Sequence, residues 1–372
     1  HRQLMSKNKN TGSRSPKKID PNIVNQTRLI TDSSISVPLV SVGCATYNGA
    51  KTLRRALDSV VRQDYPYLDI IICDDGSTDE TRAICREYSD RYSNIRYIEN
   101  KKNLGIIRNF NKLFGLGKGK YFLYADQDDV REPSYISKCV AVLESDEAVV
   151  LCHSHTGVFW KAFNNLMHIN TIDSVDNVSS VLKRYWRFLR SYSDTTIYGL
   201  IRSDAMKKTS LWSPDVGSSN ALLFELLLIG KFRQVPETLY FYSAKGLQYR
   251  PSPEEEYLRF SSERTKPKFW KPFLMLAYNQ TKGILLSSNG LWWKCCLLLI
   301  LWINVIMVNG AKMLFRMLEA LVGRRLPKWF ENFCMFAVQD LRDIRFIVPP
   351  EENRDYLPEL WLLRKGKNNE SR

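Results

Sequence analysis

Short apolar runs alternate with segments of helical periodicity along the first 150 residues. The apolar runs end in polar clusters and predict five strands, at residues 39–44, 69–73, 95–98, 121–125 and 148–152. Apolar positions at helical spacing lie between them and predict helices that begin near residues 53, 79, 105 and 133. Such strict alternation is typical of an α/β fold with a mainly parallel sheet and helices on both of its faces.

The pattern changes after residue 155. Helical periodicity predicts longer helices over residues 178–192 and 220–228, and one more strand is predicted over residues 235–242. Beyond residue 250, basic and apolar residues become frequent together, and Cys295–Val308 is an uncharged apolar run. The pattern therefore predicts an α/β region to residue 155, a second region over 156–245 and a helical region over 246–372.

Polar clusters follow the first, second and fourth predicted strands. They read Thr46-Tyr47-Asn48, Asp74-Asp75-Gly76-Ser77 and Asp126-Gln127-Asp128. The carboxyl ends of parallel strands meet at one edge of the sheet, where ligands of such folds bind. Two carboxylates on one tight turn are hard oxygen ligands that suit Mg²⁺ or Mn²⁺ bridged to a phosphate. A lone Asp-x-Asp also occurs in solvated turns, so the prediction depends on the three clusters together.

Four motifs, in their order and spacing, resemble the family 2 glycosyltransferases, which are inverting enzymes with the GT-A fold. The motifs are SVGCATYNG (41–49), IIICDDGSTD (70–79), NLGIIRNFN (103–111) and DQDDVREP (126–133). The resemblance extends over roughly residues 37–245. It implies a nucleotide-sugar-binding half at 37–155 and an acceptor-binding half at 156–245, between a flexible basic tail (1–36) and a helical, membrane-associated region (246–372).

The resemblance also implies roles for individual residues. The donor nucleotide sugar, expected to be a UDP-sugar, would be contacted by Thr46, Tyr47, Asn48, Asp75, Asn103, Arg108, Asp126 and Gln127. Asp75 would accept a hydrogen bond from the N3–H of a pyrimidine base. Asp126 and Asp128 form the expected site of Mn²⁺ or Mg²⁺: Asp128, the catalytic residue, would bind the ion directly, and Asp126 would contact the ribose or the water shell of the ion. The metal ion would stabilise the charge that develops on the departing diphosphate.

An inverting transfer needs a general base that takes the proton of the acceptor hydroxyl. Related sequences commonly carry an aspartate where Ser219 stands here, so the base has to come from elsewhere. Asp215, four residues upstream, is one candidate, and Asp129 is another. A second hypothesis follows from this departure, namely a catalytically impaired protein of the same fold that binds a nucleotide sugar or serves as a scaffold.

The net charge narrows the choice of partners. The chain has 372 residues, with 54 Lys and Arg against 39 Asp and Glu, a formal charge of +15. The tail over residues 1–36 contributes +5 and residues 245–330 contribute +9. No RNP-like strand, helix-turn-helix or zinc pattern accompanies this charge, which argues against a nucleic-acid partner. Only eight cysteines are present, too few for a disulfide scaffold.

Tryptophan, lysine and arginine flank the apolar run Cys295–Val308, which is shorter than the roughly 20 residues that span a bilayer. An interfacial helix, a tilted span and a buried core helix all remain open at this point. The sequence predicts an anionic membrane surface as the partner of residues 246–330 and a location at the cytoplasmic face of the cell membrane. The predicted enzyme transfers a sugar to a lipid-linked or polysaccharide acceptor.

Overall fold

The computed structural model describes residues 37–159, 166–170, 175–190, 193–213, 218–243 and 271–304. All the described helices and strands belong to one unit, Pro38–Arg372. The predicted boundaries after residues 155 and 245 fall inside this unit and stay predictions. The predicted tail at 1–36 lies outside the described residues.

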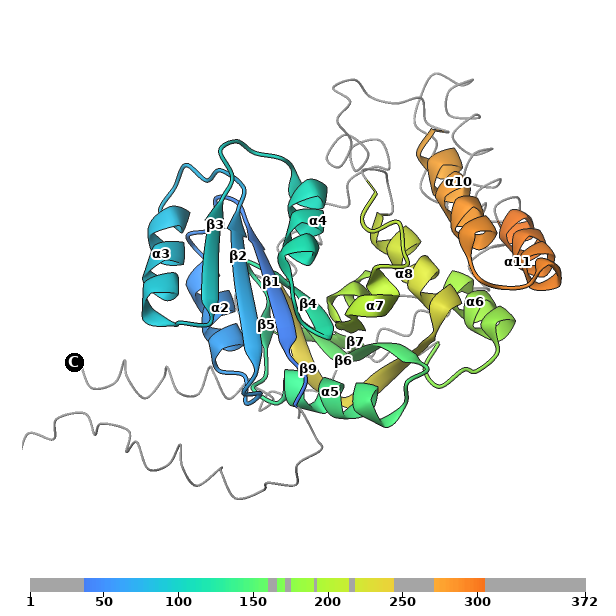
Figure 1. Ribbon diagram of the computed structural model, residues 1–372, viewed down its shortest axis with the longest axis horizontal. Coiled ribbons are helices and arrows are strands. Elements are labelled where there is room, and N and C mark those ends of the chain that lie inside the picture. The colour runs from blue at the N-terminus through green and yellow to red at the C-terminus, as the bar shows by residue number, and fades with distance from the viewer. Residues whose placement is uncertain are drawn as a thin grey trace, which may run out of the picture. The chain divides into compact units, whose positions relative to one another are not determined.

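One half of the sheet is parallel, as the alternating pattern predicts. It consists, in spatial order, of β3 (Ile95–Glu99), β2 (Leu68–Asp74), β1 (Val40–Thr46) and β4 (Tyr121–Asp126). The chain passes from β1 outward to β3 and then returns to β4 on the other side of β1 (Figure 1). In open α/β sheets a ligand usually binds in the crevice where the strand order reverses. Here the strand order reverses between β1 and β4, so the carboxyl ends of these two strands are the expected place for a ligand.

Beyond β4 the sheet is mixed, which the sequence pattern does not predict. The remaining strands are β5 (Val130–Arg131), β6 (Val149–Phe159), β7 (Leu166–Asn170), β8 (Leu200–Arg202) and β9 (Lys231–Ser243). The order continues β8-β6-β9-β5, with β7 also paired to β6. β8 runs antiparallel to β4 and β6, whereas β6 and β9 are parallel. β5 and β8 are not predicted because they are too short to show the alternation of apolar and polar residues that indicates a strand.

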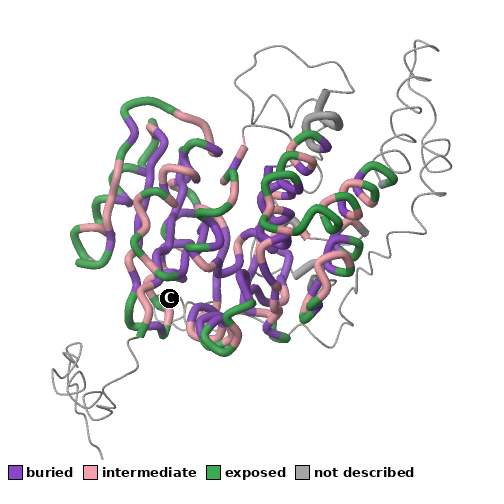
Figure 2. The backbone as a smooth tube through the Cα atoms, turned by 45° about the vertical axis from the view of Figure 1, so that its right-hand side comes forward, coloured by how far each residue is buried: buried purple, intermediate pink, exposed green. Residues whose placement is uncertain are grey.

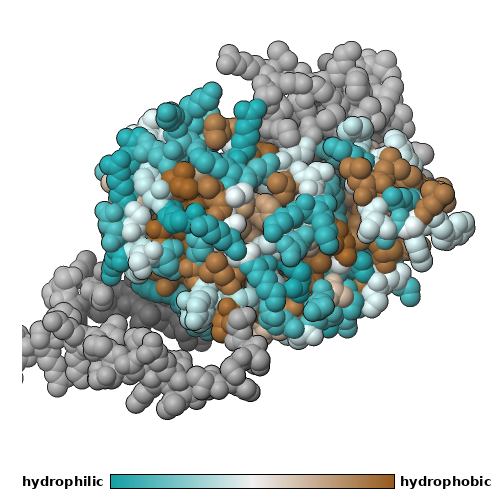
Figure 3. All heavy atoms as spheres, in the orientation of Figure 1, coloured by the Kyte–Doolittle hydropathy of each residue, from teal (hydrophilic) through white to brown (hydrophobic). Residues whose placement is uncertain are grey.

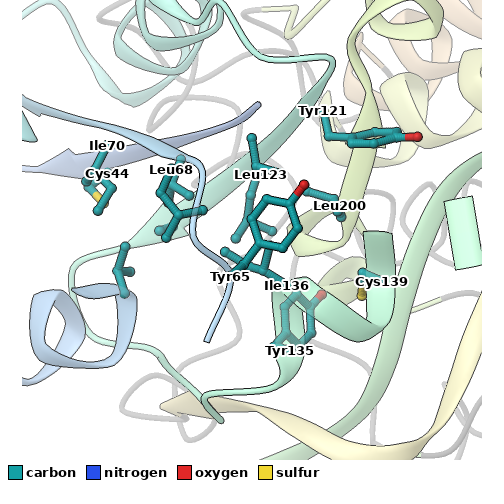
Figure 4. Packing of buried hydrophobic residues seen from close by; sticks show 14 of the residues in the cluster. Cys44, Tyr65, Leu68, Ile70, Tyr121, Leu123, Tyr135, Ile136, Cys139 and Leu200 are labelled. Carbon is teal, nitrogen blue, oxygen red and sulfur yellow. The ribbon is translucent and has the colours of Figure 1, made fainter. Parts of the chain in front are cut away.

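Three helices cover one face of the sheet. They are α2 (Leu53–Val61), α3 (Thr81–Arg91) and α5 (Tyr135–Ser145). Successive strand residues point to opposite faces, so Ile70 packs with these helices while Ile71 packs on the other side. Figure 4 shows part of this first cluster, in which Leu123 of β4 lies near Ile136 of α5.

Helices α4 (Ile106–Leu116), α6 (Val181–Arg190) and α8 (Ser218–Ile229) contribute to the core on the other face. The predicted helices near 178–192 and 220–228 are thereby confirmed. The short η1 (Asp194–Tyr198) and α7 (Ser203–Met206) lie on either side of β8 in the chain. Figure 2 shows the central strands mostly purple, whereas most helices carry exposed residues in green on their outer side, because only one side faces the core. Helix α8 differs, since none of its residues is exposed.

Two further helices extend this second layer. α10 (Lys271–Leu286) contacts α8, and α11 (Leu291–Asn304) contacts α10 and α6. Ile284 of α10 and Leu297 and Leu301 of α11 are buried in the second cluster. Among the residues that the structure describes, no helix is both long enough and apolar enough to cross a membrane.

Candidate functional site

The three polar turns that the sequence singles out meet at one edge of the sheet. In the strand register, Thr46 at the end of β1 lies opposite Asp74 at the end of β2. On its other side β1 pairs with β4, where Ala45 lies opposite Asp126. The residues that follow these three strand ends are therefore neighbours in space, as predicted.

The Gln127 side chain links the turn after β4 to the turn after β1 through hydrogen bonds. Its Oε1 accepts hydrogen bonds from Thr46 Oγ1 at 2.7 Å and from the Tyr47 N–H at 2.9 Å, and its Nε2 donates to Tyr47 O at 3.3 Å. A Cβ at Gly49 would come within 2.2 Å of the same Oε1, so a larger residue at this position would displace the Gln127 amide from its present hydrogen bonds. The amide of Gln127 is thus engaged in holding the Asp126–Asp128 turn against β1.

Asn48 joins the turn after β1 to the turn after β2. Its N–H donates to Ser77 Oγ at 2.9 Å, and its Oδ1 accepts from the Thr78 N–H at 2.9 Å. Its φ of 47° is a left-handed conformation that asparagine tolerates better than most residues. The adjacent Tyr47 is 46% exposed, so its aromatic ring is accessible at the same edge.

Asp75 is a buried member of the predicted donor-binding residues, and its carboxylate accepts three hydrogen bonds. It is 3% exposed, and its Oδ1 accepts from Asn100 Nδ2 and from the Leu104 N–H, both at 2.8 Å. Its Oδ2 accepts from the Gly105 N–H at 2.9 Å. A carboxylate has about four acceptor positions, so one remains for a further donor. Asp75 therefore fixes the loop that enters α4 and still has the capacity to bind a base N–H.

Asn103 and Arg108 lie on or beside that loop. Asn103 is exposed, and its Oδ1 accepts from the Gly105 N–H at 2.9 Å, just before α4 begins at Ile106. Arg108 is exposed on the first turn of α4, and the structure gives it no ion pair within the described part of the chain. Both side chains are accessible at the entry of the helix.

The turn after β4 concentrates negative charge. Asp126 and Asp128 are half-buried, whereas Asp129 is 1% exposed. Burial, followed by the charges of Asp126 and Asp128, raises the pKa of Asp129 to about 8. Arg55 Nη2 donates to the backbone oxygen of Asp128 at 3.2 Å, which ties the turn to α2. A cation at this turn would relieve the repulsion between the three carboxyl groups.

Asp129 connects this turn to β9. Its Oδ2 accepts from the Tyr240 hydroxyl, and its Oδ1 accepts from the Ser243 N–H at 3.1 Å. Both of its carboxyl oxygens therefore hold the end of β9 beside the turn.

Arg131, which the sequence pattern does not single out, packs against Tyr240, the residue whose hydroxyl donates to Asp129. Its guanidinium carbon lies 4.7 Å from the centre of the Tyr240 ring and 5.4 Å from that of Tyr135. Its Nη2 donates to Tyr124 O at 2.8 Å and to Tyr198 O at 3.2 Å. A guanidinium that is only 1% exposed had no distinguishing signal in the sequence, where it is one more polar residue of the DQDDVREP motif.

The donor set at Asp126 and Asp128 suits a hard divalent cation, because it offers two carboxylates on one turn. Among the described residues, no group of three or more His, Cys, Asp or Glu side chains is close enough to hold a metal ion by itself. Mg²⁺ is commonly bound by one or two carboxylates together with substrate phosphates, so two protein carboxylates fit that mode of binding.

The predicted general base Asp215 lies outside the described residues. Ser219, where the resemblance led us to expect an aspartate, belongs to the first turn of α8. Further along α8, Glu225 accepts a hydrogen bond from the Ser210 N–H, and a Cβ at Gly283 of α10 would lie 3.1 Å from its Cγ. Glu225 of α8 therefore contacts α10 on one side and the segment after α7 on the other.

Glu225→Gln is expected to stabilise the protein increasingly as pH rises above about 4.5, the ordinary pKa of this side chain. Burial raises the pKa of Glu225, so the folded state binds its proton more tightly than the unfolded state does. The contribution of Glu225 to the free energy of unfolding is therefore largest below the unfolded pKa, and it is lost as pH rises through the folded pKa. The variant's Tm minus that of the wild type, measured across a pH series, should grow with pH. A Tm difference that does not change with pH would contradict the raised pKa of Glu225.

Residues 41–212 match the family model described as glycosyl transferase family 2. The chain is 36% identical over 148 residues to an uncharacterized glycosyltransferase of Haemophilus influenzae, which covers 35% of this chain and 45% of that protein. It is 37% identical over 110 residues to the putative glycosyltransferase EpsE of Bacillus subtilis, with 29% and 40% covered. It is 36% identical over 110 residues to chondroitin synthase of Escherichia coli, with 30% and 16% covered. The chain thus matches less than half the length of these relatives.

Among solved structures, the fold is similar to residues 1–349 of S. aureus TarS in complex with UDP. The TM-score is 0.54, with 16% sequence identity and 72% of each chain covered. The complex of TarS 1–349 with UDP-GlcNAc gives a TM-score of 0.54 as well, with 82% of this chain and 80% of that chain covered. The similarity shows a shared fold, and the predicted GT-A fold is confirmed.

Proposed function

We propose that this chain, whose residues 41–212 match the model of glycosyl transferase family 2, transfers one sugar from a nucleotide sugar to a carbohydrate acceptor with inversion. The observation that carries the proposal is the meeting of the three turns after β1, β2 and β4 at one edge of the sheet. They supply an accessible aromatic ring, a buried carboxylate and a carboxylate pair at that edge.

Each of these groups has a distinct task in binding the donor. Tyr47 offers a ring face to the base, and Asp75 offers an acceptor to a pyrimidine N3–H. Arg108 and Asn103 face the donor from the entry of α4. TarS, which shares the fold, is described in complex with UDP, and this supports a UDP-sugar as the donor here.

Asp126 and Asp128 would hold Mn²⁺ or Mg²⁺ beside the diphosphate, where the ion stabilises the negative charge of the leaving group. In the transfer, the acceptor oxygen forms a bond to the anomeric carbon while the bond from that carbon to the diphosphate oxygen breaks. The acceptor's proton passes to a general base, and a nucleoside diphosphate leaves. Gln127 keeps the carboxylate turn in register with the donor-binding turn after β1.

We assign the general base to Asp215 rather than to Asp129. The two oxygens of Asp129 accept from Tyr240 and from the Ser243 N–H, and the side chain is almost fully buried. A group engaged in this way is better suited to hold β9 beside the carboxylate turn than to reach an acceptor hydroxyl. Asp129 is therefore proposed as a positioning residue.

The acceptor is proposed to be a lipid-linked oligosaccharide or a growing polysaccharide. Chondroitin synthase, one of the similar proteins, supports a polysaccharide by its name. The excess of basic residues over 245–330 supports a location at an anionic surface, which we take to be the cytoplasmic face of the cell membrane. A catalytically impaired donor-binding protein is the second candidate, favoured by Ser219 at the position of the usual aspartate.

A thermal-shift screen of nucleotide sugars, with and without Mn²⁺, tests the donor proposal. A ligand at a hundred times its Kd stabilises the folded state by about 2.7 kcal/mol, so the true donor should raise the Tm clearly. The largest rise is expected for a UDP-sugar in the presence of Mn²⁺. If none of the nucleotide sugars raises the Tm, the proposal is wrong. Binding without transfer to any of a panel of lipid-linked and oligosaccharide acceptors would favour the second candidate.

A further inference from the structure

The outer side of α11 is apolar, where a helix on the surface of a soluble domain usually presents polar residues. Leu291 is 79% exposed and Trp292 is 74% exposed, and Leu299 and Trp302 are exposed further along the helix. Figure 3 shows apolar side chains in brown gathered over α10 and α11. Leu286 at the end of α10 and Trp186 of α6 are exposed beside them. We call these six residues the tryptophan face.

The helices that carry the tryptophan face have no acidic residue. The sequences of α6, α10 and α11 contain lysine and arginine but neither aspartate nor glutamate. Lys183 and Arg187 of α6 and Lys282 of α10 are exposed. Apolar and cationic side chains without any negative charge complement a surface that is itself apolar and anionic.

An apolar hollow lies between α6 and α11. It has a volume of about 260 Å³ and is lined by Leu182, Lys183, Trp186, Arg187 and Ile300. The lining thus combines three apolar side chains with two cations. This combination fits an amphiphile whose apolar part enters the hollow while its anionic group meets Lys183 and Arg187.

We propose that the tryptophan face lies on an anionic phospholipid bilayer, with Trp186, Trp292 and Trp302 at the level of the headgroups and Lys183 and Arg187 against the lipid phosphates. Tryptophan favours this interfacial zone because one end of the ring is apolar and the other carries a hydrogen-bond donor. The proposal deepens the membrane location given under the proposed function. It identifies α6, far from α11 in the sequence, as part of the same surface.

Co-sedimentation of the full chain with vesicles tests this assignment. Vesicles of phosphatidylcholine with phosphatidylglycerol are compared with vesicles of phosphatidylcholine alone. The wild type should bind the anionic vesicles, and binding should weaken as salt is raised. Lys183→Glu with Arg187→Glu should lower the partition coefficient about 30-fold or more, because each cation near the surface contributes about fivefold. Leu291→Ser with Trp292→Ser should lower binding by a similar or larger factor.

Matched controls come from the opposite end of the sheet. Arg86→Glu with Arg91→Glu reverses two exposed charges of α3, and Tyr67→Ser removes an exposed aromatic side chain from the segment before β2. Both controls should bind vesicles as the wild type does. Unchanged binding of the α6 and α11 variants would overturn the proposal, because the attachment would then come from another basic segment. Equal losses in the controls would overturn it as well.

Two further measurements separate the alternatives. Sedimentation without lipid tests whether the chain forms a dimer. A dimer that Leu291→Ser with Trp292→Ser dissociates would show that the tryptophan face binds a second copy of the chain, and this would overturn the proposal. Donor binding and transfer to a water-soluble acceptor are measured without vesicles on the same variants and should be unchanged. Vesicle binding that fails while transfer persists overturns only this inference. Transfer that fails while vesicle binding persists overturns only the proposed function.

Discussion

Asp128→Ala is expected to lower the rate of sugar transfer about a thousandfold or more while leaving the fold intact. The variant removes one of the two carboxylates proposed to hold the metal ion beside the diphosphate. The remaining Asp126 and the phosphates would bind the ion more weakly, and the charge on the leaving group would lose its stabilisation. The loss should therefore affect the chemical step in addition to donor binding.

Folding should tolerate this substitution because Asp128 is only half-buried and its charge repels the neighbouring Asp129. The measurements are the initial rate of transfer over a range of Mn²⁺ concentrations and the Tm. Asp90→Ala, at an exposed position of α3, serves as the matched control and should keep full activity. Full activity of Asp128→Ala would be incompatible with the proposed metal site, in which this carboxylate binds the ion directly.

Asp75→Ala is expected to have a different outcome, namely a loss of stability of about 3–5 kcal/mol together with the loss of donor binding. Three donors depend on this carboxylate, and the variant would leave the amide of Asn100 and the N–H groups of Leu104 and Gly105 without it. The loop into α4 would loosen, and the acceptor for the base would be gone. Denaturant unfolding and calorimetric titration with UDP measure the two effects.

Asp69→Ala provides the matched comparison at the opposite end of the same strand. Asp69 accepts from Ser41 and from Arg96, so its removal should also lower stability. Donor binding should survive in that variant, because Asp69 is remote from the carboxyl end of β2. If Asp75→Ala unfolds at the same denaturant concentration as the wild type and binds UDP normally, both roles assigned to Asp75 are wrong.

The parallel half of the fold could be predicted because its signals are local. Each strand from β1 to β4 is a short, mostly apolar segment, and each is followed by a polar turn. Parallel pairing then brings the ends of the strands to one edge, so the neighbourhood of Thr46, Asp75 and Asp126 follows from topology alone. The mixed half could not be predicted in this way, because polar residues and Gly157 interrupt the apolar pattern of β6 and because β8 has only three residues.

The hydrogen bonds that hold the site together could not be predicted either, because they join residues that are far apart in the sequence. Gln127 bonds to Tyr47, 80 positions away, and Asp129 bonds to Tyr240, 111 positions away. No periodicity connects such partners, and each residue is individually compatible with an ordinary polar turn. The strand order shows what the pattern does not: β9 lies beside β5, so the DQDDVREP motif is bonded both to the turn after β1 and to β9.

The bonds of Gln127, Asn48 and Asp75 have a consequence for the thermodynamics of donor binding. These residues connect the three turns to one another and to the loop before α4 through the protein's own hydrogen bonds. A nucleotide that binds at this edge of the sheet therefore meets turns that are already ordered. The entropy lost when these turns become fixed is a cost of folding and not of binding. Binding of the nucleotide portion should consequently show a small entropic penalty and a modest change in heat capacity, as expected for a preorganised site.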